Sequence, residues 1–179
     1  LPDIWAWRVD SVTEQSGWSK HRDRGSREAK SILFEDGMPK SLTVWIPLSD
    51  VTTHHSCMHV LPASKDPLYW SSHRSIPNEA WGGLVEEARA LPTSAGGVLM
   101  WNQRVMHWGS RASRRAKGPR YSLSVEFQSG AIPPLSSLGV SDPLVLPSMA
   151  ERVCTIASVL RRYQHMYGYS DEWTSFSHR

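Results

Sequence analysis

Short runs of β-forming residues, separated by turn signals, constrain the fold of this chain more than any other feature. The runs span residues 4–9, 41–48, 57–61, 87–91, 98–101, 105–108 and 121–127. Turn-forming pairs such as Asp36-Gly37 and Gly96-Gly97 lie between them. Many short strands in this arrangement are typical of an antiparallel sandwich or barrel, whereas a parallel doubly wound sheet needs helices between its strands. The sequence therefore predicts a mainly β fold.

One segment near the C-terminal end departs from this pattern and predicts a helix. From Met149 onward the apolar residues recur at helical spacing, and Ser148 with Glu151 matches the signature of a capping box. We expect this helix to end near Gly168, and a shorter helical turn at residues 77–81. At 179 residues and with no convincing linker, the chain is expected to form a single domain over 1–179.

Composition excludes several classes of protein. Lys and Arg number 20 against 17 Asp and Glu, and this mild excess forms no dense basic stripe, so we expect no nucleic-acid partner. No apolar run approaches the roughly 18 residues that a membrane helix needs, and no signal segment opens the chain, which predicts a soluble, cytoplasmic protein. Cys57 and Cys154 are too few for a disulfide framework, which agrees with a reducing compartment.

Two places in the sequence could supply metal ligands. In an extended chain His21 and Asp23 project from the same face, so an imidazole and a carboxylate could share one ion. The same pair could equally form a surface ion pair. His107 lies in an apolar run on a predicted interior strand, where a metal or a backbone carbonyl would satisfy the imidazole.

The last predicted strand has one polar and one apolar face. Its alternation places Arg120, Ser122 and Ser124 together. Such a face normally meets water on an antiparallel sheet. If it lines the interior instead, the guanidinium and a hydroxyl could bind a carboxylate through paired charge-assisted hydrogen bonds.

Taken together, these residues suit iron and a keto acid, because two histidines and one carboxylate leave open positions on Fe(II) and a following Arg can hold 2-oxoglutarate. Residues 17–127 resemble the phytanoyl-CoA dioxygenase family of Fe(II)/2-oxoglutarate-dependent oxygenases. The resemblance rests on HRD at His21, on SLTVWIPLSDVTTHHSCMHVLPASKD, and on AGGVLMWNQRVMHWGS followed by PRYSLSVEF.

The resemblance implies a double-stranded β-helix, which is a cupin-like jelly roll, with a C-terminal helix. It implies that His21, Asp23 and His107 bind the iron and are the catalytic residues. It also implies that the co-substrate 2-oxoglutarate is held by Arg120, Ser122 and Trp45, although Trp45 equally suits the core. Arg111, Arg114 and Arg115 remain alternatives to Arg120. Lys65 and Gly97 depart from the family pattern, and the N-terminal portion usual in the family is expected to be missing.

The expected activity is hydroxylation of a small-molecule substrate with O2, releasing succinate and CO2. Family halogenases have a small residue in place of the carboxylate ligand, so Asp23 favours hydroxylation. Two alternatives stay open: a Trp-rich β-sandwich that binds a ligand such as a sugar without turnover, and a cupin-like metal isomerase without 2-oxoglutarate. If both ligand segments meet at one mouth, as the family's architecture implies, the basic residues near them would ring its entrance with positive charge and predict an anionic substrate. These residues are Lys20, Arg22, Arg24, Arg27, Lys30, Arg111, Arg114, Arg115 and Lys117.

Overall fold

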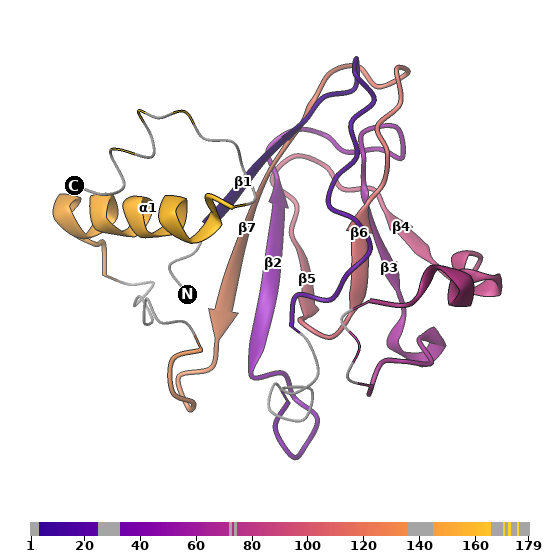
Figure 1. The fold of residues 1–179 in the computed structure, drawn as a ribbon, viewed down its shortest axis with the longest axis horizontal. Coiled ribbons are helices and arrows are strands. Elements are labelled where there is room, and N and C mark those ends of the chain that lie inside the picture. The colour runs from indigo at the N-terminus through magenta and orange to yellow at the C-terminus, as the bar shows by residue number, and fades with distance from the viewer. Residues whose placement is uncertain are drawn as a thin grey trace. The chain divides into compact units, whose positions relative to one another are not determined.

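The computed structural model describes residues 4–24, 33–71, 73, 75–135, 145–165, 170, 172 and 175. It divides into two compact units, one formed by Ile4–Ile132 and the other by Leu1–Asp3 with Pro133–Arg179. The first unit contains every described strand, and the second contains the helix α1 (Figure 1). The expectation of one domain over 1–179 stays a prediction.

A four-stranded antiparallel sheet forms one layer of the first unit. Its strands lie in the order β1-β7-β2-β5. Their bounds are Ile4–Val9 for β1, Arg120–Gln128 for β7, Ser41–Pro47 for β2 and Leu99–Asn102 for β5. The register places Trp7 of β1 and Pro47 of β2 on either side of Ser122, with Val9 opposite Arg120.

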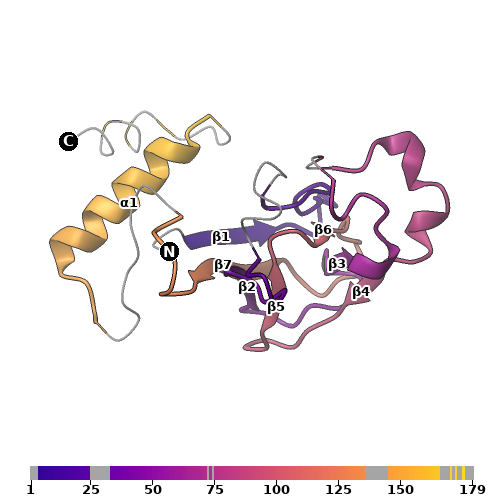
Figure 2. The ribbon, with the colours of Figure 1, turned by 90° about the horizontal axis from the view of Figure 1, so that it is seen from below.

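A three-stranded antiparallel sheet forms the other layer, in the order β4-β3-β6 (Figures 1 and 2). Its strands are β4 (Arg89–Leu91), β3 (Met58–Leu61) and β6 (Met106–Gly109). Three short 3-10 helices belong to the same unit: η2 (Ala63–Lys65), η3 (Asn78–Trp81) and η4 (Gly83–Val85). The first of the two ligand segments joins this layer through an isolated antiparallel bridge between His21 and His107.

The core joins side chains from both sheets. Trp45 and Trp101 of the larger sheet pack with Met58 of the smaller one, together with Val51 and Cys57. A second cluster buries Leu61, Ile76, Trp81 and Met106. Burying such apolar surface is the dominant stabilising contribution to a fold of this kind. Cys57 is 0 % exposed and packs in the first cluster as a small apolar group.

The predicted elements agree with the structure to within a few residues at each end. The polar face of β7 is the buried one: Arg120 and Ser122 are 3 % and 1 % exposed, whereas Tyr121 is 44 % exposed. The mainly β jelly roll is therefore confirmed, and its polar strand face points inward. The expected helical turn at 77–81 corresponds to η3.

The helix α1 (Met149–Tyr163) begins at the expected residue, and the Ser148–Glu151 capping box is present. Its side-chain and backbone bonds satisfy N–H groups that have no partner in the first turn of a helix. The expected end near Gly168 lies outside the described residues. Within the described part of the chain, no helix is long and apolar enough to cross a membrane.

Candidate metal and co-substrate site

His21, Asp23 and His107 converge between the two sheets. The Nε2 atoms of His21 and His107 lie 3.5 and 3.4 Å from Oδ1 of Asp23, and one ligand atom from each residue lies within 4.8 Å of the others. Two backbone hydrogen bonds fix this spacing: the N–H of His21 donates to the His107 carbonyl at 3.1 Å, and the N–H of His107 donates to the His21 carbonyl at 3.0 Å.

Hydrogen bonds orient each of the three side chains. Nδ1 of His107 lies 3.0 Å from the Val105 carbonyl, and Nδ1 of His21 lies 2.6 Å from the Ser19 carbonyl. An Nδ1–H that donates to a carbonyl leaves the Nε2 lone pair for a metal. Oδ2 of Asp23 accepts from Oγ1 of Thr43 at 2.7 Å and from the indole N–H of Trp101 at 3.1 Å, while Oδ1 faces the imidazoles.

The electrostatics keep Asp23 and His107 in the protonation states that metal binding requires. Burial alone would raise the pKa of the Asp23 carboxyl, but His107, His21 and Thr43 outweigh it and hold that pKa well below its usual range. Burial lowers the pKa of His107 and so favours the neutral imidazole. One carboxylate and two imidazoles form the donor set that suits Fe(II) with open positions, so the residues present fit this metal.

Arg120, Ser122 and Trp45 lie together on the inner face of the larger sheet. The guanidinium of Arg120 lies over the Trp45 ring at 5.6 Å, and its Nη1 donates to the Ser56 carbonyl. Trp45 is 3 % exposed and belongs to the core cluster, and its part in holding 2-oxoglutarate stays a prediction. Burial lowers the pKa of Arg120 to about 10, which leaves the guanidinium charged at neutral pH.

Two buried polar atoms on β7 find no hydrogen-bond partner among the described residues: Nε of Arg120 and Oγ of Ser122. A buried donor left unpaired destabilises the fold, so each such atom calls for an explanation. A carboxylate placed against this pair would satisfy both atoms. The donor chemistry of β7 therefore fits the distal carboxylate of 2-oxoglutarate.

The alternative arginines lie elsewhere. Arg111 and Arg114 have exposed side chains that reach the carboxylate of Glu14 at 3.6 and 3.4 Å. Arg115 is exposed as well. Among the four candidates, only Arg120 is buried in the interior of the sandwich.

Two glycines beside Arg120 were not singled out from the sequence. A Cβ on Gly17 would lie 2.8 Å from the Cα of Gly109, and a Cβ on Gly109 would lie 2.7 Å from the Cα of Gly17. Both added atoms would also lie within 3.4 Å of Nη1 of Arg120. The two backbones approach this closely only because neither residue has a side chain, and this approach shapes the space around the guanidinium.

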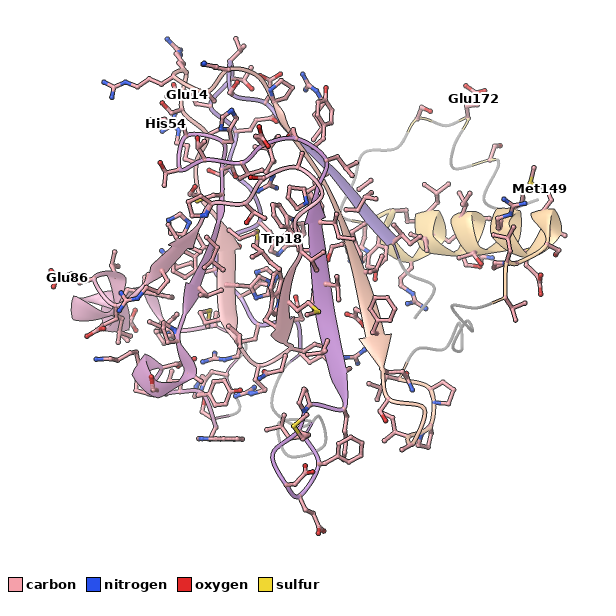
Figure 3. All side chains as sticks on the ribbon, turned by 180° about the vertical axis from the view of Figure 1, so that it is seen from behind. Glu14, Trp18, His54, Glu86, Met149 and Glu172 are labelled. Atoms are coloured by element: carbon pink, nitrogen blue, oxygen red, sulfur yellow. The ribbon has the colours of Figure 1, made fainter. Side chains whose placement is uncertain are left out.

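A row of tryptophans that the sequence did not place leads to His21. Trp5 stacks on Trp7 with ring centroids 5.9 Å apart, Trp7 meets Trp18 edge to face at 5.5 Å, and Trp18 meets the His21 ring at 6.1 Å. Figure 3 shows Trp18 where the two sheets face each other, and its carbonyl accepts from the N–H of Gly109 in β6. An excess of Trp was the signal in the sequence, but its spacing alone does not indicate the row.

The expected basic entrance is only partly present. Arg22 is 0 % exposed and pairs with Asp66, so its placement at an entrance is wrong. Arg24 pairs with Glu126 at 3.3 Å, and Lys20 lies over the Trp81 ring at 4.9 Å. Arg27 and Lys30 lie outside the described residues. Much of the expected positive charge is therefore compensated or buried.

Several solved structures share this fold. SnoK, a non-heme alpha ketoglutarate dependent carbocyclase from nogalamycin biosynthesis, matches with a TM-score of 0.51 at 20% identity, over 70% of this chain and 47% of its own. EctD from S. alaskensis, with 2-oxoglutarate and 5-hydroxyectoine, matches with 0.52 at 14%, over 84% and 55%. HygX from Streptomyces hygroscopicus, with nickel, 2-oxoglutarate and hygromycin B bound, matches with 0.53 at 14%, over 73% and 56%.

The chain spans about a quarter to a half of the first structures that it matches, at 26% of EvdMO1 and 47% of SnoK. None of the curated protein sequences matches it. The sequence profile described as Phytanoyl-CoA dioxygenase (PhyH) matches residues 9–118, which is more than half of the chain and includes all three candidate ligands. The cofactors of that family are Fe(II) and 2-oxoglutarate, with O2 as oxidant. The chain belongs to the phytanoyl-CoA dioxygenase family.

Proposed function

We propose that this chain carries the catalytic jelly roll of an Fe(II)/2-oxoglutarate-dependent dioxygenase that hydroxylates a small molecule. One O2 and one 2-oxoglutarate are consumed for each C–H bond converted to C–OH, and succinate and CO2 are released. The observation that carries the proposal is the convergence of His21, Asp23 and His107 within 4.8 Å, in a sandwich that also buries Arg120 with no partner for its Nε among the described residues.

Each residue has a distinct part in this proposal. His21, Asp23 and His107 would hold the iron, which when bound supplies the oxidation of an unactivated carbon. The hydrogen bonds from Thr43 and Trp101 hold the Asp23 carboxylate in one orientation. Arg120 and Ser122 bind the distal carboxylate of 2-oxoglutarate, and the Trp45 ring flanks the guanidinium.

The substrate is proposed to be a small molecule with the reacting carbon placed near His21 and the Trp18 ring. HygX and EctD have small molecules bound, hygromycin B and 5-hydroxyectoine. SnoK is a carbocyclase, so members of this fold do not all hydroxylate. The presence of Asp23 separates hydroxylation only from halogenation, and hydroxylation as the type of oxidation is therefore part of the proposal. An anionic substrate stays a prediction, because most of the described basic side chains near the ligands already have partners.

The two alternatives account for less of the site. A ligand-binding sandwich without turnover has no need of a carboxylate between two imidazoles. A metal isomerase would use the three ligands but not the buried Arg120, whose Nε has no partner in the described part of the chain. Consumption of 2-oxoglutarate separates the isomerase from the dioxygenase.

The test is an anaerobic titration with Fe(II), followed by addition of 2-oxoglutarate and O2 and measurement of succinate. The wild-type chain should bind one equivalent of iron and form succinate slowly even without a substrate. Asp23→Ala and His107→Ala should lose both properties, because two remaining ligands hold a labile ion weakly. His59→Ala, a half-buried histidine on β3, is the matched control and should keep both. Unaltered iron binding by Asp23→Ala would overturn the assignment, and iron binding by the wild-type chain without succinate would favour the isomerase.

A further inference from the structure

A second charged cluster lies behind the segment that carries His21 and Asp23. It consists of Arg22, Asp66 and Arg104, whose exposed fractions are 0 %, 6 % and 0 %. Two arginines and one aspartate leave an excess of one positive charge in the interior. A buried charge is stable only where hydrogen-bond or ion-pair partners replace its hydration. The partners of these three side chains therefore show which segments of the chain the cluster connects.

Arg22 points away from the metal site because side chains alternate along extended chain. His21 and Asp23 face the interior of the sandwich, and the residue between them must face the other way. Antiparallel hydrogen bonds hold this segment beside the approach to His107: the N–H of Arg24 donates to the Gln103 carbonyl at 3.3 Å, next to the two bonds between His21 and His107. The Arg22 side chain therefore lies on the opposite side of the same ladder.

The guanidinium of Arg22 connects three separate parts of the chain. Its Nη2 donates to Oδ2 of Asp66. Its Nη1 donates to the His73 carbonyl at 3.1 Å, and its Nε donates to the Arg104 carbonyl at 3.1 Å. The bond to the Arg104 carbonyl reaches the chain close to the metal site, since Arg104 precedes His107 by three residues. The Arg22 guanidinium therefore connects the segment that carries His21 and Asp23 to the segment that leads to His107.

Arg104 holds the segment of residues 66–71, called the covering segment below, from another side. Its Nε donates to the Tyr69 carbonyl at 3.0 Å, and its Nη2 donates to the Tyr69 carbonyl and to the Ser71 carbonyl at 2.8 Å. Burial and the neighbouring charge of Arg22 lower the pKa of Arg104. Asp66 also accepts from the N–H of Leu68 at 2.9 Å, which fixes the start of the covering segment.

We propose that Arg22 is a positioning residue for the metal centre, which holds the spacing of His21 and Asp23 against His107 through Asp66 and the Arg104 carbonyl. This inference rests on the proposed function, because it assigns Arg22 a role toward the metal that those three residues would bind. A planar guanidinium with three fixed donors is needed for this role, and a lysine ammonium cannot reproduce that geometry.

The test measures Ni(II) binding by calorimetry, together with the absorption of the anaerobic Fe(II)·2-oxoglutarate complex, in Arg22→Lys, Arg22→Met and Asp66→Asn. Partners that orient metal ligands typically change metal affinity by roughly 10- to 100-fold when removed, so we expect a weakening in that range. Arg22→Lys and Asp66→Asn keep charge or shape and serve where Arg22→Met does not fold. The absorption of the iron complex should shift in position, because the ligand geometry changes.

Leu61→Ala is the control for stability alone. Leu61 is 0 % exposed in the second core cluster, so its truncation destabilises the same region without removing any of the hydrogen bonds that Arg22 makes. The positioning role is supported if Arg22→Lys weakens Ni(II) binding while Leu61→Ala lowers the melting temperature by the same amount and leaves Ni(II) affinity unchanged. Unchanged Ni(II) affinity in folded Arg22→Lys and Asp66→Asn, or an equal loss in Leu61→Ala, would overturn it. Failure of the wild-type chain to bind Ni(II) would instead reject the proposed function.

Discussion

At the scale of single residues, Arg120 and Ser122 on β7 each keep one buried polar atom without a hydrogen-bond partner among the described residues. Arg120 uses Nη1 on the Ser56 carbonyl and keeps Nε without a partner among the described residues. Its position on β7 is fixed by the register, which pairs it with Val9. The protein therefore holds a desolvated cation in place before any carboxylate arrives, which lowers the reorganisation that binding requires.

Replacing Arg120 tests this role directly. Arg120→Lys keeps the charge but loses the planar fork, so the affinity for 2-oxoglutarate should fall by about 1.5–3 kcal/mol, as for a charge-assisted hydrogen bond. Calorimetric titration with 2-oxoglutarate in the presence of Ni(II) measures it. Arg115→Lys, an exposed arginine, is the matched control and should bind as the wild type does. An unchanged dissociation constant in Arg120→Lys would contradict the assignment.

The two cysteines should differ sharply in reactivity. Cys57 is 0 % exposed, and burial raises the pKa of its thiol, so both access and thiolate content are low. Cys154 is exposed on α1. A disulfide reagent at neutral pH should label Cys154 within minutes and Cys57 only after denaturation, as mass spectrometry of tryptic peptides would record. Equal labelling of both thiols in the native protein would contradict the burial of Cys57.

At the scale of elements, alternation along strands carries most of what the sequence could predict. It placed His21 with Asp23, and Arg120 with Ser122, because a period of two is local to each segment. It could not place Arg22, whose partner Asp66 is 44 residues away, and the positive charges nearby suggested an entrance instead. The contact of Gly17 with Gly109 was equally hidden, since a close approach depends on how two segments cross.

That close approach makes a prediction about the elements on either side. Gly109→Ala puts a methyl group 2.7 Å from the Cα of Gly17, so β6 and the segment before His21 must separate. Overpacking of this kind costs about 1–3 kcal/mol of the free energy of unfolding, which urea denaturation can measure. Gly83→Ala is the control, because nothing lies within 4 Å of its added Cβ. Equal stability of the two variants would show that the segments separate freely.

At the scale of the whole molecule, binding to the folded chain should couple to its stability. Metal and 2-oxoglutarate would contact residues from three parts of the chain, the segment before β2, β6 and β7, and these assemble only in the folded state. A ligand that binds only the folded state stabilises it in proportion to the logarithm of its excess over the dissociation constant. The unfolding transition therefore reports the integrity of the site without any substrate.

Thermal denaturation with Ni(II), and then with Ni(II) and 2-oxoglutarate, should show two separable increments. At about 100 times its dissociation constant a ligand adds about 2.7 kcal/mol, which for a chain of this size corresponds to roughly 5–10 °C. Asp23→Ala should lose the Ni(II) increment, whereas Arg120→Lys should keep it and lose most of the 2-oxoglutarate increment, because the two variants remove different contacts. A chelator added to the wild-type chain should reverse both. If Ni(II) leaves the melting temperature of the wild-type chain unchanged at millimolar concentration, the three converging side chains do not form a metal site. If Arg120→Lys loses neither increment, the carboxylate of 2-oxoglutarate binds elsewhere.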